Sequence, residues 1–371
     1  MSILWRDAMS QALYGPDGFF VAGTGPADHF RTSVHASPAF TGALLRLLAQ
    51  VDAALGHPDR LDVVDVGAGR GELLRTLLRL VAAGDTAGPA VGGDPSSTAV
   101  HPSLAKRLRC TAVEYAARPE NLTEEINWVS EIPGHLAGLL IATEWLDNVP
   151  LDVGVHTTDG WRYVLVDPGT GAETIGEQVS PADRDWLTRW WPPSSPATDG
   201  VPGPTSTAAG GGARRSGHQR AEIGRTRDAA WATAIRKIDR GLAVAVDYGH
   251  LRADRPVDGT LTGYRAGRQV PPVPDGSSDI TAHVAMDSVA SAGAAVARCA
   301  YSLVSQREAL RALGADGGRP PLSMAGTDPA GYVRALAAAS AVAELTDPAG
   351  LGGHLWLRQP VGIPLGPAVA R

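Results

Sequence analysis

The residues of this chain best suited to bind a cofactor are three closely spaced glycines, Gly67, Gly69 and Gly71. They follow the apolar run Leu61–Val66 and precede an amphipathic segment, Glu72–Val81, so a strand, a turn and a helix are expected in that order. Glycines let a ligand approach the backbone closely, and the first turn of a helix presents unpaired N–H groups. We therefore predict that this turn binds a cofactor, although a tight turn without a ligand would use the same residues.

The spacing of the glycines distinguishes between classes of cofactor. A dinucleotide loop needs a glycine where Glu72 stands, and a P-loop needs Gly-Lys-Ser or Gly-Lys-Thr at its end. The acidic residue before the glycines, Asp65, can bind an ammonium group, so the pattern favours a cofactor with an amino-acid moiety. Glu114, which ends the expected strand Cys110–Glu114, is placed to bind a ribose diol. The Gly- and Pro-rich stretch 84–103 is then an inserted loop.

A second group of acidic residues, Glu144 and Asp147, follows another expected strand, Leu139–Thr143. Ligands of open α/β sheets bind beyond the carboxyl ends of the strands, so both side chains should face the cofactor crevice. If the segment is helical, the i, i+3 spacing puts both on one face, and Trp145 forms a wall of the site. The alternative is a helix N-terminus whose first turn is stabilised by acidic residues.

Several motifs, in the same order along nearly the whole chain, resemble those of the MidA-type methyltransferase family, which includes the mitochondrial complex I assembly methyltransferase. They are Gly18-Phe19-Phe20, Asp65 through Leu73, Thr143 through Pro150, Asp247-Tyr248-Gly249, Gly259 through Tyr264, Asp279 through Val284 and Ser305-Gln306. The resemblance implies a Rossmann-like class I methyltransferase fold, that is, α/β with a doubly wound, mainly parallel sheet, and S-adenosyl-L-methionine as the cofactor. It also implies that the cofactor-binding residues are Asp65, Gly67, Gly69, Gly71, Glu114, Thr32 and Glu144.

Members of the family methylate arginine on a protein subunit of respiratory complex I, so the resemblance implies a protein substrate of that kind. Methyl transfer from a sulfonium is an in-line displacement, and an arginine acceptor is protonated in water. Carboxylates must therefore position the guanidinium, and a proton must leave as attack proceeds. The expected catalytic residues are Glu144, Asp147, Asp247 and His283, with Asp279 beside them. For Asp279 and His283 a loop-capping hydrogen-bond network is the alternative.

The chain departs from the family pattern at four places. His29 and His35 stand where the family has Asp and Glu, Thr143 stands where it has Asn, and Arg265–Gln269 replaces a stretch that contains histidine. These departures keep two other functions open: a non-catalytic assembly or scaffold protein that retains the fold, and a methyltransferase for a small metabolite. A nicotinamide-dependent enzyme is a more distant alternative, which Glu72 disfavours.

Composition sets wider limits. A chain of 371 residues with 44% hydrophobic and 19% charged residues is typical of a globular protein. The formal net charge of −6 argues against a general nucleic-acid binder. Two cysteines make no disulfide framework and the N-terminus shows no export signal, so we expect a cytoplasmic protein. No apolar stretch approaches a membrane span, and the histidines lack metal-ligand spacing, so neither a membrane span nor a metal is expected. The sequence gives no indication of the oligomeric state.

We expect two regions in the chain. Residues 1–60 form a helical and loop segment that covers the active site, and residues 61–371 form the methyltransferase domain. Within that domain we expect a flexible linker at residues 192–220, flanked by a basic, solvated arm that extends to Arg227. We also expect a lid or substrate loop at residues 250–283. Further strands are expected at Val153–His156, Trp161–Val166, Leu242–Asp247 and Leu355–Gln359, and helices at 3–14, 38–55, 182–191, 226–240, 302–313 and 328–344.

Overall fold

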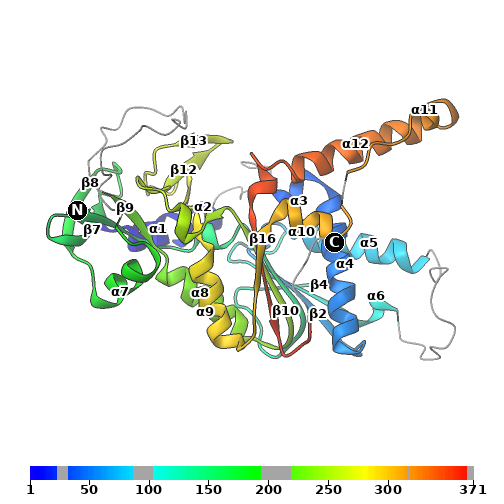
Figure 1. The fold of residues 1–371 in the computed structure, drawn as a ribbon, viewed down its shortest axis with the longest axis horizontal. Coiled ribbons are helices and arrows are strands. Elements are labelled where there is room, and N and C mark those ends of the chain that lie inside the picture. Colours follow the sequence, from blue (N-terminus) through cyan, green and yellow to red (C-terminus); the bar gives the residue numbers. More distant parts are fainter. Residues whose placement is uncertain (23–31, 87–102, 194–218, 316, 366–371) are drawn as a thin grey trace.

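The computed structural model describes residues 1–22, 32–86, 103–193, 219–315 and 317–365. His29 and nearly all of the expected linker at 192–220 lie outside the described residues. The described chain forms a large sheet, right of centre in Figure 1, and a smaller sheet near the N-terminus at the left. The two sheets and the helices packed on them hold the candidate site between them.

The large sheet has seven strands. Their order is β16 (Ser302–Ser305), β17 (Leu355–Val361), β10 (Ile238–Asp247), β5 (Leu136–Thr143), β2 (Leu61–Val66), β3 (Leu108–Val113) and β4 (Ile126–Val129). Neighbouring strands are parallel from β10 to β4, whereas β17 runs antiparallel to both of its neighbours. The expected α/β class with a mainly parallel sheet is therefore confirmed.

Helices cover both faces of the large sheet. Successive residues of a strand point to opposite faces, so in β2 Val63 packs into one core and Val64 into the other. Strands buried on both sides have continuous apolar sequences, which explains the run at Leu61–Val66. One face is covered by α4 (Pro38–Leu55), α5 (Glu72–Thr86), α10 (Gln306–Ala312) and α12 (Pro329–Leu345), and the other by α8 (Arg225–Arg236) and α9 (Met286–Ala297).

The smaller sheet is antiparallel and includes the N-terminus. Its order is β1 (Ile3–Leu4), β7 (Gly160–Val166), β6 (Asp152–Thr157) and β9 (Arg220–Ile223), with β8 (Glu173–Gln178) paired to β7. The helix expected at 3–14 is α1 (Trp5–Tyr14), whose Trp5, Met9 and Leu13 pack against Val153 and Val166. On the opposite face, α7 (Pro181–Trp190) packs Trp186 against the sheet. The N-terminal helix is thus part of the core of this sheet.

The region 250–283, expected to be an irregular lid, contains a third small sheet. Its order is β13 (Arg268–Val270), β12 (Thr262–Arg265) and β14 (Asp279–Thr281), and a two-residue pair, β11 (Gly249–His250) with β15 (Val284–Ala285), flanks it. The prediction of an irregular segment was wrong here because strands of two to four residues, separated by Gly and Pro, leave too few positions for a period-two pattern to show.

Two helix predictions also need correction. The helix expected at 302–313 begins only at Gln306, since Leu303 and Val304 pair with β17. Ser305 caps α10: its Oγ accepts from the Glu308 amide, and its own amide donates to the Glu308 carboxylate. The helix expected at 226–240 ends at Arg236, where β10 follows almost at once. Helix α9 was not expected, because its Ala-, Ser- and Gly-rich sequence has little apolar periodicity.

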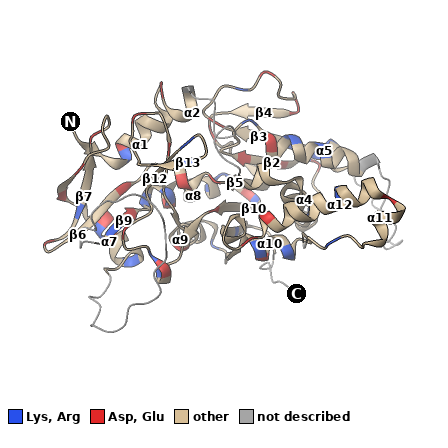
Figure 2. Ribbon diagram, turned by 90° about the horizontal axis from the view of Figure 1, so that it is seen from above, with Lys and Arg blue, Asp and Glu red and all other residues tan. Residues whose placement is uncertain are grey.

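The remaining elements are short. They are α2 (Phe19–Ala22), α3 (Ser33–Ala36), α6 (Leu104–Arg107), η2 (Leu146–Asn148), η3 (Arg252–Asp254), α11 (Ser323–Thr327) and η4 (Leu351–Gly353). Every helix within the described ranges lacks either the length or the apolar character that crossing a bilayer would require. Figure 2 shows acidic and basic residues interspersed over the two halves of the described structure.

Candidate functional site

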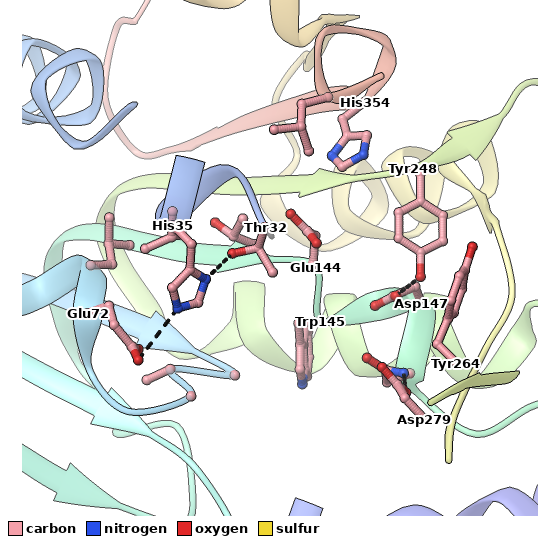
Figure 3. A pocket seen from close by; sticks show the side chains of 18 of the residues that line it. Thr32, His35, Glu72, Glu144, Trp145, Asp147, Tyr248, Tyr264, Asp279 and His354 are labelled. Carbon is pink, nitrogen blue, oxygen red and sulfur yellow. Dashed lines mark hydrogen bonds and ion pairs between the residues drawn. The ribbon is translucent and has the colours of Figure 1, made fainter. Parts of the chain in front are cut away.

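A cavity of about 660 Å³ opens beyond the carboxyl ends of β2, β5 and β10. The glycine turn after β2 and the segment after β5 form its floor, while residues from the N-terminal segment, from β14 and from the loop before β17 complete its walls. This is where an α/β sheet of this topology binds ligands. Figure 3 shows Glu144 in the middle of the cavity, with His35 and Glu72 on one side and Asp147 and Tyr248 on the other.

The cavity is strongly acidic. Three histidines line it, and no Lys or Arg is found among the described residues that do so. A cavity of this kind, with so little opposing charge, favours cationic ligands. Its six carboxylates are Asp65, Glu72, Glu114, Glu144, Asp147 and Asp279.

The glycine turn is held close to β3. The amides of Gly67 and Ala68 donate to the Val113 carbonyl oxygen at 3.0 and 3.3 Å. Gly67 has a φ of 72°, and a Cβ on it would lie only 3.2 Å from Trp145 Cδ1, so a side chain here would crowd the cavity wall. Gly67 and Gly69 line the cavity as expected. Gly71, which was also expected to bind the cofactor, does not line the cavity. Its φ of 79° favours glycine, and a Cβ there would lie 2.9 Å from Leu122 Cδ1.

Glu114 is fixed by backbone amides. Its carboxylate accepts from the Gly69 amide at 3.1 Å and from the Tyr115 amide at 2.7 Å, and the side chain lines the cavity. Burial raises the pKa of Glu114, although these backbone hydrogen bonds oppose the rise. Glu114, the carboxylate expected to bind a ribose, is therefore hydrogen-bonded directly to the glycine turn.

Asp65 is buried at the end of β2 and is 3% exposed. It lines the cavity, and no group of the described chain donates a hydrogen bond to its carboxylate. Burial raises its pKa well above the ordinary value, and the negative charges of Glu72 and Glu114 add to the effect. An unpartnered carboxylate in this position can accept hydrogen bonds from an ammonium group, so Asp65, the glycine turn and Glu114 fit a nucleoside cofactor with an amino-acid moiety.

Glu144 occupies the centre of the cavity because of its backbone. Its φ of 52° is in the left-handed region, and its amide donates to the Val246 carbonyl at 2.8 Å. The side chain accepts a hydrogen bond from the Ser33 amide at 3.1 Å. Burial raises the pKa of Glu144 to about 7. The expected helical geometry after β5 is thus replaced by a left-handed residue and a 3-10 turn, yet Glu144 and Asp147 both face the cavity.

Asp147 and Asp279 form the acidic end of the cavity. Asp147 Oδ2 accepts from Tyr248 Oη and from Thr281 Oγ1, whereas its buried Oδ1 has no hydrogen-bond partner in the described structure. Asn148 Nδ2 donates to Asp279 Oδ1 at 2.6 Å. Burial raises the pKa of both carboxyls, and the charge of Asp147 raises that of Asp279 further. The two carboxyls therefore concentrate negative charge at this end of the cavity.

Asp247 does not reach the cavity. Its Oδ2 accepts from the backbone amides of Leu146 and Asp147, at 3.0 and 3.3 Å, and the residue is 1% exposed. The structure therefore places this expected catalytic residue beneath the site, where it orients the turn that carries Asp147. His283 does line the cavity, and its ring centroid lies 5.1 Å from that of Tyr248.

The chain belongs to a family of methyltransferases. Its residues 43–303 match the family model described as "Putative S-adenosyl-L-methionine-dependent methyltransferase". The cofactor is S-adenosyl-L-methionine, in agreement with the geometry of Asp65, the glycine turn and Glu114. No curated protein matches the chain.

Two solved structures from Burkholderia thailandensis share the fold of this methyltransferase. One is described as a "likely methyl transferase" bound to S-adenosylhomocysteine; it is 23% identical, aligns over 100% of this chain and 91% of its own, and has a TM-score of 0.71. The other, a native structure of an uncharacterised protein, is also 23% identical, aligns over 100% and 90%, and has a TM-score of 0.70. The likeness spans the whole described architecture.

Several lining residues of the methyltransferase were not expected from its sequence. His35 lies between Thr32 Oγ1, 2.7 Å from its Nδ1, and Glu72 Oε1, 3.5 Å from its Nε2. Its only signal in the sequence was its departure from the family motif. Tyr14 reaches the cavity from α1 and donates to the Asn148 carbonyl at 3.2 Å, and His354 enters from the loop before β17. Neither of these two stands in a recognisable motif.

Proposed function

We propose that this protein is a Rossmann-like class I methyltransferase of the MidA type that methylates an arginine side chain of a protein. The observation that carries the proposal is the cavity itself, in which the cofactor-binding residues adjoin an acidic end with Asp147 and Asp279 and no Lys or Arg among the described lining residues. A guanidinium is a cation with five N–H donors and no acceptor, so carboxylates complement it.

The cofactor end has a role for each of its residues. Asp65 binds the ammonium group, Glu114 binds the ribose diol, and Gly67 and Gly69 let the cofactor approach the backbone. S-adenosyl-L-methionine supplies a methyl group on a sulfonium, a good leaving centre. Tyr14, Thr32 and other residues of the N-terminal segment line the same cavity, which supports a covering role for residues 1–60.

The acidic end positions the acceptor and removes its proton. Asp147 and Asp279 hold the guanidinium by charge-assisted hydrogen bonds, with one acceptor nitrogen directed toward the methyl group. As the N–C bond forms and the S–C bond breaks, one guanidinium proton leaves, and Glu144 accepts it because burial keeps its pKa near neutrality. The products are methylated guanidinium, S-adenosylhomocysteine and protonated Glu144, so atoms and charge balance.

The proposal is tested by incubating the protein with methyl-labelled S-adenosyl-L-methionine and extract from cells that lack it. Label in protein that is recovered as methylarginine after hydrolysis supports the proposal. Label in low-mass material instead indicates a small-molecule methyltransferase. Cofactor binding with no labelled product indicates a non-catalytic assembly or scaffold protein, which the substitution of His35 for the glutamate of the family pattern would favour.

A matched pair of variants ties the activity to the site. Asp147→Asn removes the charge that holds the acceptor, so kcat/KM should fall by about 10²-fold or more while cofactor affinity is retained. Asp159→Asn, in the exposed turn between β6 and β7, should leave both unchanged. Wild-type transfer rates in Asp147→Asn would rule out its role in holding the acceptor.

A further inference from the structure

Arg227 is a fully buried cation near the acidic end of the cavity, and no part of the proposed mechanism uses it. The residue lies in the first turn of α8 and is 1% exposed. The sequence predicted it as part of a solvated basic arm, and that prediction was wrong. Taking a guanidinium out of water costs several kcal/mol, so a buried one calls for compensation.

The compensation is not an ion pair. Among the described residues no carboxylate oxygen lies within 4.0 Å of the Arg227 guanidinium, and all of its hydrogen bonds go to backbone carbonyls. Nε donates to Val149 at 3.2 Å, Nη1 donates to Ala282 at 2.9 Å and to His283 at 3.1 Å, and Nη2 donates to Asp147. Only a planar fork with several donors can reach four carbonyls at once.

These carbonyls belong to two segments that are far apart in the chain. One segment, 147–150, carries Asp147 into the cavity, and the other, 279–284, carries Asp279 and His283. The segments also contact each other, since the Ala282 amide donates to the Asp147 carbonyl at 3.3 Å. Arg227 therefore joins the two walls of the acidic end from below.

The charge of Arg227 interacts electrostatically with titratable groups of both walls and of every neighbouring element. These groups are Asp147 in η2, Asp247 and Tyr248 at the end of β10, Glu222 in β9, His250 in β11 and His283 after β14. Burial raises the pKa of Asp147 and of Asp247, and the guanidinium opposes both rises. Asp147 is further surrounded by Glu144 and Asp279, which are also acidic.

We propose that Arg227 is a positioning residue for methyl transfer, which fixes the distance between the two acidic walls and places a positive charge behind Asp147, the carboxyl that holds a cationic acceptor. The proposal rests on the proposed function where it concerns the acceptor. If Arg227 only held the two segments together, its hydrogen bonds would be needed and its charge would not. The two roles are separable because lysine keeps the charge without the fork, and methionine keeps neither.

The first experiment needs no catalysis. The melting temperatures of wild type, Arg227→Lys and Arg227→Met are measured between pH 4 and pH 8. At high pH the carboxylates are ionised and the guanidinium attracts them, so the gap between wild type and Arg227→Met should widen as the pH rises. The gap for Arg227→Lys should be independent of pH. A gap for Arg227→Met that does not change with pH would overturn the proposal, whether or not the protein methylates anything.

The second experiment uses methyl transfer to the protein acceptor. Loss of the charge should raise the pKa of Asp147 in Arg227→Met, so its titration joins that of Glu144, and the acidic limb of the kcat/KM profile should become steeper and lie at higher pH. Arg227→Lys should keep the wild-type limb but lose up to about 10²-fold in acceptor kcat/KM, mostly through KM, with affinity for S-adenosylhomocysteine retained. If Arg227→Met does not fold, the measurements on Arg227→Lys test the proposal alone. An acceptor KM equal to that of the wild type, or an acidic limb of kcat/KM at a different pH, contradicts the proposal.

A neighbour on the same helix is the matched control. Arg225 lies in the first turn of α8, is half exposed and pairs with Asp183 at 2.8 Å, away from the cavity. Arg225→Met should leave the pH limb and the acceptor KM at their wild-type values. A wild-type protein that transfers no methyl group refutes the proposed function, and the melting-temperature series then still decides the role of Arg227.

Discussion

At the scale of single residues, a backbone dihedral angle determines the electrostatics of the site. Glu144 turns through a left-handed conformation directly after β5, which costs a non-glycine residue of the order of 1 kcal/mol. The turn brings its carboxylate within hydrogen-bond distance of the Ser33 amide, at the lining of the cavity. Strain of this kind persists where the surrounding structure enforces it, and here it places a carboxyl with a pKa near 7 in the middle of an acidic cavity.

The pKa of Glu144 predicts the pH dependence of the reaction. As the proposed proton acceptor, Glu144 must be ionised, so kcat/KM should rise as the pH increases through about 7. Glu144→Gln should remove this limb and lower the rate by about 10² to 10⁴-fold. The free energy of unfolding has the opposite trend. The pKa of Glu144 in the folded protein exceeds its ordinary value of 4.5, so stability falls as the pH rises from about 4.5 to about 7. This fall should be smaller in Glu144→Gln. Exposed Glu131→Gln is the control, and a flat wild-type profile from pH 6 to 8 would contradict the role.

At the scale of elements, the parts of the site that follow long, strongly patterned segments could be predicted. Leu61–Val66 and Leu139–Thr143 are buried parallel strands, so the polar residues after them had to meet at one edge of the sheet. Residues whose place depends on how separate elements pack together could not be predicted. Tyr14 and His354 reach the cavity only through tertiary packing, and Asp247 ends a strand of the same kind but points beneath the site.

A buried ion pair anchors α4 to the start of β3. Asp52 receives two hydrogen bonds of 2.7 Å from Arg107 and one of 2.8 Å from His57, and both members of the Asp52–Arg107 pair are buried. Burial alone would raise the pKa of Asp52, but these hydrogen bonds lower it. Its stabilising contribution is therefore present at neutral pH and is lost as the pH falls through the lowered pKa.

Breaking this pair should destabilise the whole fold. Asp52→Asn leaves a buried guanidinium without its counter-charge, so the free energy of unfolding should fall by about 3–5 kcal/mol, measured as a lower apparent urea midpoint at pH 7. Arg60→Ala removes an ion pair to Asp62 whose cation is mostly exposed, and should cost about 1 kcal/mol or less. Equal midpoints for the two variants would show that the buried pair contributes no more than the exposed one.

At the scale of the whole molecule, the cavity exists because two sheets meet. The large sheet supplies the proposed cofactor-binding residues at the ends of β2 and β3, while α1 and β14 supply Tyr14 and Asp279 from the side of the smaller sheets. The aromatic ring of Tyr14 lies 5.3 Å from that of Tyr115, the residue after Glu114, so the two parts touch at the cofactor end. Ligand binding across this junction should therefore stabilise the molecule as a unit.

Thermal unfolding tests that expectation and the identity of the cofactor together. A ligand at 100 times its dissociation constant adds about 2.7 kcal/mol to the stability of the folded state, so S-adenosylhomocysteine should raise the melting temperature by several degrees. NAD should not, because Glu72 stands where a dinucleotide loop needs glycine. Glu114→Gln weakens the ribose contact and should reduce the rise, whereas Glu120→Gln, at an exposed position nearby, should not. A larger shift with NAD than with S-adenosylhomocysteine would contradict the assignment of Asp65, the glycine turn and Glu114 as the cofactor site.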